Sequence, residues 1–443
     1  MKKTLLSVLC LLLVAVMALS LAACGEKKEE LPPKKDPVSQ FKADGFEKST
    51  LKNQVSWEGL NQFKSTTEIA ELYKTSPEEA IKEARQIAID FFNYAKTATW
   101  IPADNWDFTH HDDGTGPDQM IGGQVYGGLP YVGLASGAIY RVMDFIDEET
   151  GVVDIHSAGG PNHEWQKMFG NQCANGAYQG WSRFINSAKY SGTPRMTVAN
   201  NFFRVGPYTY PDFTPSWGVE YNTKAVCAEN GDQTIFESYA LMTPADGFVN
   251  FTTAGHVMML VEAPVVVRAA DGKIDPAQSY CIITDQHVQF STYQHEGGDT
   301  CQAANYVNKK MTFQSLVGSG YLPFTYKEWL GEDPIEVPET KFSHSGESIE
   351  LSKLFNAKVT CNYHIYDIYA EVYDAAGNEV VKIATHNAGA SEYELRFMKA
   401  GMQAKIWGDL DKLDASKSYT IKVYAQLGTG ERPTLWEGKL IVD

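Results

Sequence analysis

The feature of this chain that most constrains its fold is a stretch of helical periodicity that begins at a cysteine. From Cys173 onward, apolar residues recur at spacings of three and four, at Ala174, Ala177, Tyr178, Trp181, Phe184 and Ile185. This spacing predicts a helix with one buried face and with Cys173 in its first turn. The dipole at a helix N-terminus favours a thiolate, which is the reactive form of cysteine. A buried structural cysteine is the alternative interpretation.

A histidine follows on the second of two short strands that we expect after this helix. Residues 248–251 and 257–261 are the two apolar runs, and residues 252–255 form the tight turn between them. His256 then lies at the start of a buried strand. A base within hydrogen-bond reach of the sulfur could accept its proton or form a thiolate–imidazolium pair. A core histidine with satisfied hydrogen bonds is the alternative.

A third polar group is needed to fix the tautomer and orientation of such a histidine ring. The next expected strand, residues 279–284, ends in Asp285, Gln286 and His287, and any of the three could serve. Alternation places Gln286 on the same strand face as Thr284 and places Asp285 on the opposite face. The prediction favours Gln286, with Asp285 as the second candidate.

The order of these pieces resembles a known family. GLPY at residues 128–131, the helix-starting Cys173, Pro-x-Asp at residues 244–246 and Gly-His-Val around His256 resemble the NlpC/P60 cysteine peptidase superfamily. The chain is also similar to the related CHAP amidases, in which a glutamine precedes the nucleophile, as Gln172 does here. The resemblance covers residues 126–287.

This resemblance implies a papain-like domain in which the helix that bears the cysteine packs on an antiparallel sheet. It implies that Cys173 is the nucleophile, that His256 is the base, and that Tyr131 forms the oxyanion site together with the backbone N–H of Cys173. The chain reads Gln-Cys-Ala-Asn at residues 172–175, where the family usually shows Asp-Cys-Ser-Gly. This departure bears on the substrate more than on the nucleophile.

The N-terminus indicates the compartment. Lys2 and Lys3 precede an apolar run at residues 5–19, and Leu-Ala-Ala stands directly before Cys24. This pattern resembles a bacterial lipoprotein signal, which implies cleavage before Cys24 and lipid attachment to its sulfur. A plain secretory signal is the alternative. Residues 24–50 are charged and contain prolines, so we expect a solvated tether from the outer face of the cytoplasmic membrane.

Composition excludes one class of partner. The formal net charge of −17 argues against nucleic acid, which favours basic surfaces.

Five cysteines follow Cys24, so at least one is unpaired, although a bridge such as Cys227–Cys281 could form outside the cell. No glycine-rich stretch has phosphate-loop spacing and no HExxH occurs. We expect no cofactor and no metal, and interpret the His-His-Asp-Asp stretch at residues 110–113 as a polar loop.

The chain divides into four regions by pattern. We predict a signal peptide at residues 1–23, a tether at 24–50, a catalytic domain at 51–333, and an all-β immunoglobulin-like sandwich at 334–443. The catalytic region begins with a helix at residues 76–96, which we expect to be opened by a capping box and to pack on that domain. The fold class is therefore α+β.

Two hypotheses about function follow. The first is a lipid-anchored thiol hydrolase that cleaves an amide bond in peptidoglycan stem peptides. The second is an inactive surface protein that binds a glycan or a protein through an aromatic groove. The intact pair of Cys173 and His256 favours the enzyme.

Overall fold

The computed structural model describes residues 50–107, 119–132, 137–154, 169–186, 202–209, 222–252, 255–386, 393–397 and 403–443. The expected signal peptide, Cys24 and almost all of the expected tether lie outside these ranges, as do residues 110–113. The fold is α+β, as the sequence predicted. Over the ranges given, no helix combines the length and the apolar character that crossing a membrane requires.

Within the described residues, the largest sheet has ten strands, here called the large sheet. Its central part is antiparallel, because β8, β9, β10 and β11 pair in succession with neighbours of opposite direction. The strand order is β5 (Ile146–Asp147), β6 (Val152–Val153), β1 (Thr99–Pro102), β4 (Tyr126–Gly127), β11 (Thr300–Thr312), β10 (Tyr280–Gln294), β9 (Gly255–Leu260), β8 (Gly247–Phe251), β12 (Leu322–Tyr326) and β7 (Phe202–Arg204). The strands expected around residues 248–261 and at 279–284 are confirmed, and β10 runs ten residues beyond its predicted end.

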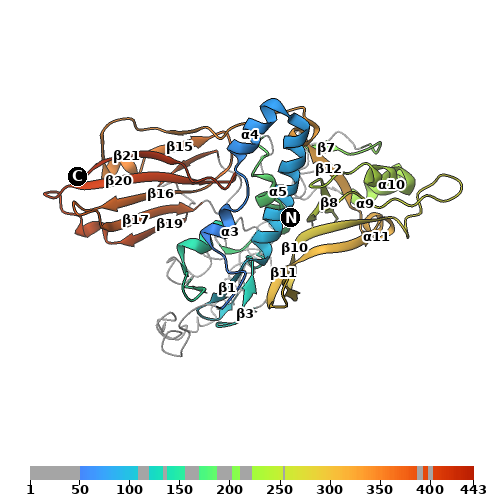
Figure 1. Cartoon of the computed structure of the whole chain (residues 1–443), viewed down its shortest axis with the longest axis horizontal. Helices are drawn as coiled ribbons and strands as arrows, with labels where there is room; N and C mark the ends of the chain where they lie inside the picture. The colour runs from blue at the N-terminus through green and yellow to red at the C-terminus, as the bar shows by residue number, and fades with distance from the viewer. Residues whose placement is uncertain are drawn as a thin grey trace, which may run out of the picture.

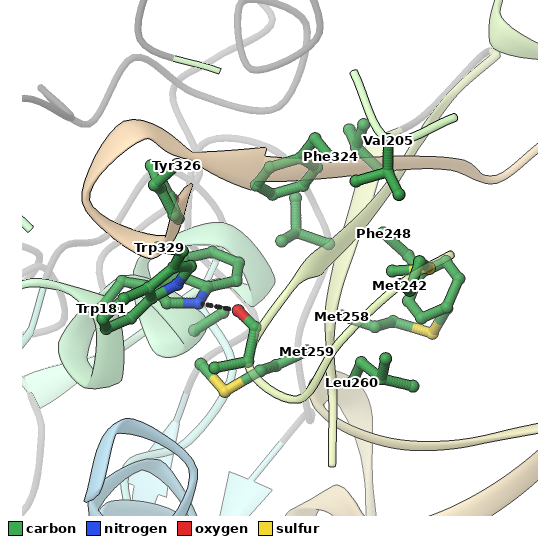
Figure 2. Packing of buried hydrophobic residues seen from close by; sticks show 14 of the residues in the cluster. Trp181, Val205, Met242, Phe248, Met258, Met259, Leu260, Phe324, Tyr326 and Trp329 are labelled. Carbon is green, nitrogen blue, oxygen red and sulfur yellow. Dashed lines mark hydrogen bonds between the residues drawn. The ribbon is translucent and has the colours of Figure 1, made fainter. Parts of the chain in front are cut away.

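Helix α7 (Cys173–Trp181) packs on β9 and β10 of the large sheet. Its apolar face joins the main core, where Trp181 is fully buried and its indole N–H donates to the carbonyl of Ala245 at 2.8 Å. Figure 2 shows Trp181 beside Tyr326 and Trp329, with Met258, Met259 and Leu260 of β9 close by. Burying a large apolar side chain contributes roughly 1.5–3 kcal/mol. Because α7 begins at Cys173, the predicted helix with a cysteine in its first turn is confirmed.

Helix α5 (Pro77–Thr97) matches the helix predicted at residues 76–96, and it packs against α7. The predicted capping box at its start is wrong, because the side chain of Ser76 makes no capping hydrogen bond. Ser76 also ends α4 (Thr66–Thr75), and its N–H donates to the carbonyl of Leu72. The capping box forms one helix earlier, between Ser65 and Glu68.

The other helices in the described part of the chain are short. They are α3 (Trp57–Asn61), η1 (Ile139–Asp144), α9 (Thr223–Asn230), α10 (Asp232–Ala240), α11 (Phe313–Gly318), α12 (Lys327–Leu330), α13 (Leu351–Leu354) and η3 (Leu410–Lys412). A separate pair of strands is formed by β2 (Trp106–Asp107) and β3 (Gln119–Met120).

The C-terminal strands form two further sheets that share one core. One has the order β13 (Thr340–Phe342), β15 (Lys358–Cys361) and β18 (Glu394–Arg396). The other has the order β14 (Ser348–Glu350), β21 (Thr434–Ile441), β20 (Tyr419–Leu427), β16 (Ile365–Tyr373), β17 (Glu379–His386) and β19 (Gln403–Gly408). Figure 1 shows these strands on one side of α5 and the hairpin of β10 and β11 on the other. Residues 366–372 lie in β16 and residues 419–425 lie in β20, within the region where the sequence predicted strands.

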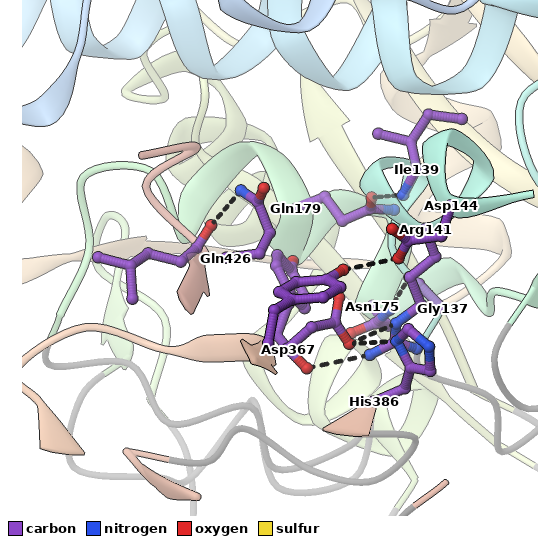
Figure 3. Close-up of polar contacts among 12 residues, drawn as sticks. Gly137, Ile139, Arg141, Asp144, Asn175, Gln179, Asp367, His386 and Gln426 are labelled. Atoms are coloured by element: carbon purple, nitrogen blue, oxygen red, sulfur yellow. Dashed lines mark hydrogen bonds and ion pairs between the residues drawn. The ribbon is translucent and has the colours of Figure 1, made fainter. Parts of the chain in front are cut away.

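A buried polar cluster joins the C-terminal strands to the rest of the chain. Arg141 of η1 donates from Nε to Asp367 of β16 at 2.8 Å, and His386 of β17 contacts the same carboxylate oxygen at 3.0 Å. Figure 3 shows this cluster beside α7, where Gln179 accepts from the N–H of Ile139 in η1. All three side chains of the cluster are fully buried. The C-terminal strands therefore pack directly against η1.

Candidate active site

Cys173 is the first residue of α7, and its side chain is buried. The preceding Gln172 is the N-cap residue of α7, with an extended backbone and no capping hydrogen bond from its side chain. The GLPY segment runs beside this point. Tyr131 forms a parallel bridge with Asn171, whose N–H donates to the carbonyl of Pro130 at 2.9 Å. This pairing places Tyr131 next to the sulfur, and its hydroxyl hydrogen-bonds to Cys173.

His256 and Asp285 are brought together by the register of β9 and β10. Asp285 pairs directly with Met258, and His256 lies two residues before Met258 on the same strand face. The two side chains are therefore diagonal neighbours, and Nε2 of His256 lies 2.8 Å from Oδ2 of Asp285. Because Nε2 contacts the carboxylate, Nδ1 is the nitrogen left to hydrogen-bond with Cys173.

The charges of Cys173 and His256 support each other. Burial is the largest single influence on the pKa of the Cys173 thiol and acts to raise it. The charge of His256 and hydrogen bonds from His256, the Val257 N–H and Tyr131 together outweigh burial. The pKa of Cys173 is therefore lowered from its ordinary value. Burial alone would lower the pKa of His256, but the thiolate and Asp285 raise it to about 10. The arrangement favours a thiolate beside an imidazolium.

Asp285 is itself held in place on both carboxylate oxygens. Oδ2 contacts His256, and Oδ1 accepts the backbone N–H of Tyr306 in β11 at 3.0 Å. Burial acts to raise the pKa of Asp285, but the hydrogen bond and charge of His256, together with the charge of Lys96, hold it below its usual value. An ionised carboxylate is thus available to orient the histidine ring.

Gln286, the residue that the sequence favoured as the third member, makes a different contact. Its amide Nε2 donates to the carbonyl of Leu129 at 2.7 Å. A side chain at Gly176 of α7 would lie 2.7 Å from Oε1 of Gln286, so this amide faces the helix. The order of preference is therefore corrected: Asp285 contacts His256, and Gln286 holds the segment that carries Tyr131.

The other described cysteines differ sharply from Cys173. All five thiols in the described part of the chain are free, so the bridge considered between Cys227 and Cys281 is not formed. Burial raises the pKa of Cys227 and Cys301 to about 12 and that of Cys361 to about 11. The pKa of Cys281 is raised as well, also by burial. The site thus lowers the pKa of one thiol among five.

Sequence reasoning missed the residues that support the site. Lys96 is 3% exposed and donates to the carbonyl of Asp285 at 3.1 Å. Asn171 accepts both the Gln172 N–H at 3.0 Å and the amide of Asn175 at 2.6 Å, which braces the start of α7. One signal was available for Lys96: it lies four residues after Phe92, on the apolar stripe of its helix.

Comparison with known proteins adds no assignment. No family model matches the chain, and a search of curated proteins gives no match. The chemical interpretation therefore depends on the geometry of Cys173, His256, Asp285 and Tyr131.

Proposed function

We propose that this chain is a thiol hydrolase that cleaves an amide bond through an acyl-enzyme. The observation that carries the proposal is the order Asp285, His256, Cys173: Asp285 lies 2.8 Å from His256, and the charge of His256 lowers the pKa of Cys173 in the first turn of α7. A nucleophile, a base within reach and a group that orients the base are the parts that such chemistry requires.

In the first step, the Cys173 thiolate attacks the carbonyl carbon of the amide. The negative charge that develops on the carbonyl oxygen is stabilised by the backbone N–H of Cys173 and the hydroxyl of Tyr131. The imidazolium of His256 donates its proton to the leaving amine, and a thioester remains on the sulfur. Water then attacks the thioester while His256 takes a proton from it, which releases the carboxylic acid and restores the pair.

The substrate class follows from the resemblance and the N-terminus. In this proposal residues 51–333 form a papain-like domain of the NlpC/P60 type, and residues 334–443 form an immunoglobulin-like sandwich. The chain would be anchored at the cell surface through lipid on Cys24, where peptidoglycan stem peptides are the accessible amides. The two sheets of C-terminal strands share one core, which supports the proposal of an immunoglobulin-like sandwich.

The first experiment measures the reactivity of the thiol. Residues 25–443 are treated with iodoacetamide from pH 4 to 9, and modification of each cysteine is followed by mass spectrometry. We expect Cys173 to be labelled at pH values well below the ordinary thiol pKa of about 8.5. The His256→Ala variant should label only at higher pH, because it removes the positive charge that stabilises the thiolate.

Cys227 and Cys281 serve as internal controls, since they are as buried as Cys173 but their pKa values are raised rather than lowered. They should be labelled only after unfolding in urea. If folded Cys173 is inert, or if its labelling follows that of an ordinary thiol whatever residue occupies position 256, the hydrolase is excluded. The binding-protein hypothesis would then be the better account.

A further inference from the structure

Lys96 places a buried cation directly behind the carboxylate of the candidate site. It lies in the last turn of α5, with its ammonium over the ring of Phe92 at 4.3 Å. Nζ donates to the carbonyl of Asp285 at 3.1 Å, to the carbonyl of Tyr306 at 2.9 Å and to the hydroxyl of Thr284. Three acceptors match the three N–H groups of an ammonium.

These acceptors surround an irregularity in the β10–β11 pairing. Ile283 pairs with Lys309 but Asp285 pairs with Tyr306, so β11 contains one extra residue at this point. Asn308, within the extra stretch, has a φ of 55°, which is typical of a bulge. A bulge interrupts the ladder of backbone hydrogen bonds, and Lys96 supplies donors to two of the carbonyls there.

The bulge also sets the direction of the Asp285 side chain. The N–H of Tyr306 donates to Oδ1 of Asp285, which leaves Oδ2 for His256. Asn305, on the other side of Tyr306, donates from its amide to the carbonyl of Lys96 at 2.8 Å. Lys96 at the end of α5 thus donates hydrogen bonds to the bulge and accepts one from it. The bulge includes Asp285, which contacts His256 directly.

We propose that Lys96 is a positioning residue that holds this bulge in the form that directs Asp285 at His256, and so maintains the charged pair of His256 and Cys173. The inference rests on the proposed hydrolase function and identifies a residue that keeps Asp285 in contact with His256. Burial lowers the pKa of Lys96 to about 7, and the charge of Asp285 limits that fall. In turn, the charge of Lys96 contributes to the lowered pKa of Asp285.

The test is Lys96→Met, which keeps the length of the side chain and removes its charge and donors. Without the cation, Asp285 should hold His256 less well, and the thiolate should lose part of its stabilisation. We expect the alkylation rate of Cys173 at pH 6 to fall about tenfold, which corresponds to a rise of about one pH unit in its labelling midpoint. Asp285→Asn should move the midpoint in the same direction.

Arg85→Met is the matched control. Arg85 is a second buried cation on α5, and its described hydrogen bonds go to Asp246 at 2.9 Å and to the carbonyls of Pro244 and Trp329, away from the candidate site. Its loss should lower the melting temperature but leave the pH profile of Cys173 unchanged. If Lys96→Met folds and keeps the wild-type profile, Lys96 has only a structural role and the inference is overturned.

Thr284→Val provides the decision if Lys96→Met does not fold. It removes one acceptor of Lys96, so a smaller shift in the same direction, about threefold in the alkylation rate at pH 6, supports the inference, and an unchanged profile overturns it.

The two proposals fail in different ways. A wild-type protein without low-pH labelling rejects the hydrolase itself, whereas normal wild-type labelling with unshifted variants rejects only the role of Lys96.

Discussion

At the scale of single residues, Cys173 and His256 determine each other's charge. The pKa of Cys173 is lowered from 9.0 and that of His256 is raised from 6.5 to about 10. At pH values between the lowered pKa of Cys173 and the raised pKa of His256, the sulfur is negative and the ring is positive. Activity should therefore fall in acid, as the thiolate takes up a proton, and fall again above about pH 10, as the ring loses its own.

Cys173→Ala tests this mutual dependence. The charge of the thiolate is the largest of the influences that raise the pKa of His256, while burial opposes it. Removing the sulfur should therefore lower the pKa of His256 from about 10 towards its ordinary value, with Asp285 still in contact. A histidine NMR titration of both proteins measures the change. An unaltered titration in Cys173→Ala would contradict the charged pair.

The sequence predicted Cys173 and His256 because each stands at a recognisable place, a helix start and a strand start. It ranked Gln286 above Asp285, and the contact of Asp285 with His256 reverses that order. Alternation separates these two residues onto opposite faces, but the face that meets His256 depends on the register between β9 and β10. Register is a relation between strands, so it is not contained in the pattern of either strand alone.

At the scale of elements, α7 approaches its neighbours through glycines. Gly176 lies against Gln286 of β10, and Gly180, one turn later, lies against the backbone of α5 at Ala88. A methyl group at position 180 would overlap the carbonyl oxygen of Ala88. The spacing of four residues puts both glycines on one helix face, and this face packs closely against both β10 and α5. This close packing fixes the position of the Cys173 backbone.

Gly180→Ala should consequently destabilise the protein, although alanine favours helices. The added methyl group meets backbone rather than a movable side chain, so α5 and α7 must separate. We expect a loss of about 1–3 kcal/mol in the free energy of unfolding, measured with urea. Gly318→Ala in α11 is the control, because a methyl group there meets no atom within 4 Å. Equal stability of the two variants would refute the close approach.

The helices were predicted well because their apolar stripes are long. Helix α5 begins within a residue of its expected start, and α7 begins at the expected cysteine. Their caps were predicted less well. Ser76 has the residues of a capping box after it, but it must also end α4, and one residue cannot adopt both geometries. Competition between neighbouring elements is invisible when each helix is considered alone.

At the scale of the whole molecule, the C-terminal strands and the rest of the chain share a buried boundary. Tyr366 of β16 belongs to the same core as Tyr140 of η1, and its hydroxyl lies 3.4 Å from that of Ser182, just after α7. Arg141 and Asp367 are 226 residues apart and both fully buried. The sequence predicted an all-β region here but not its contact with η1, since nothing in the pattern pairs residues so distant along the chain.

Asp367→Ala tests how strongly this boundary couples the two parts. The change leaves Arg141 buried without its carboxylate, which costs about 3–5 kcal/mol. Urea unfolding followed by two probes should show one transition that moves as a whole. Lys353→Ala, which breaks an exposed pair with Glu350, should change the stability by less than about 1 kcal/mol. Two separate transitions, with only one affected by Asp367→Ala, would show that the parts unfold independently.

The position of β9 and β10 in the middle of the large sheet has a consequence for the order of events in folding. The sulfur, the histidine and the carboxylate come from residues 173, 256 and 285, and Tyr131 comes from a segment earlier still. Contacts so distant along the chain form slowly, because the entropy of closing long loops must be overcome first. A nascent or partly folded chain therefore carries Cys173 as an ordinary thiol. The pKa of Cys173 is lowered only once β9 and β10 have paired and His256 lies beside the sulfur.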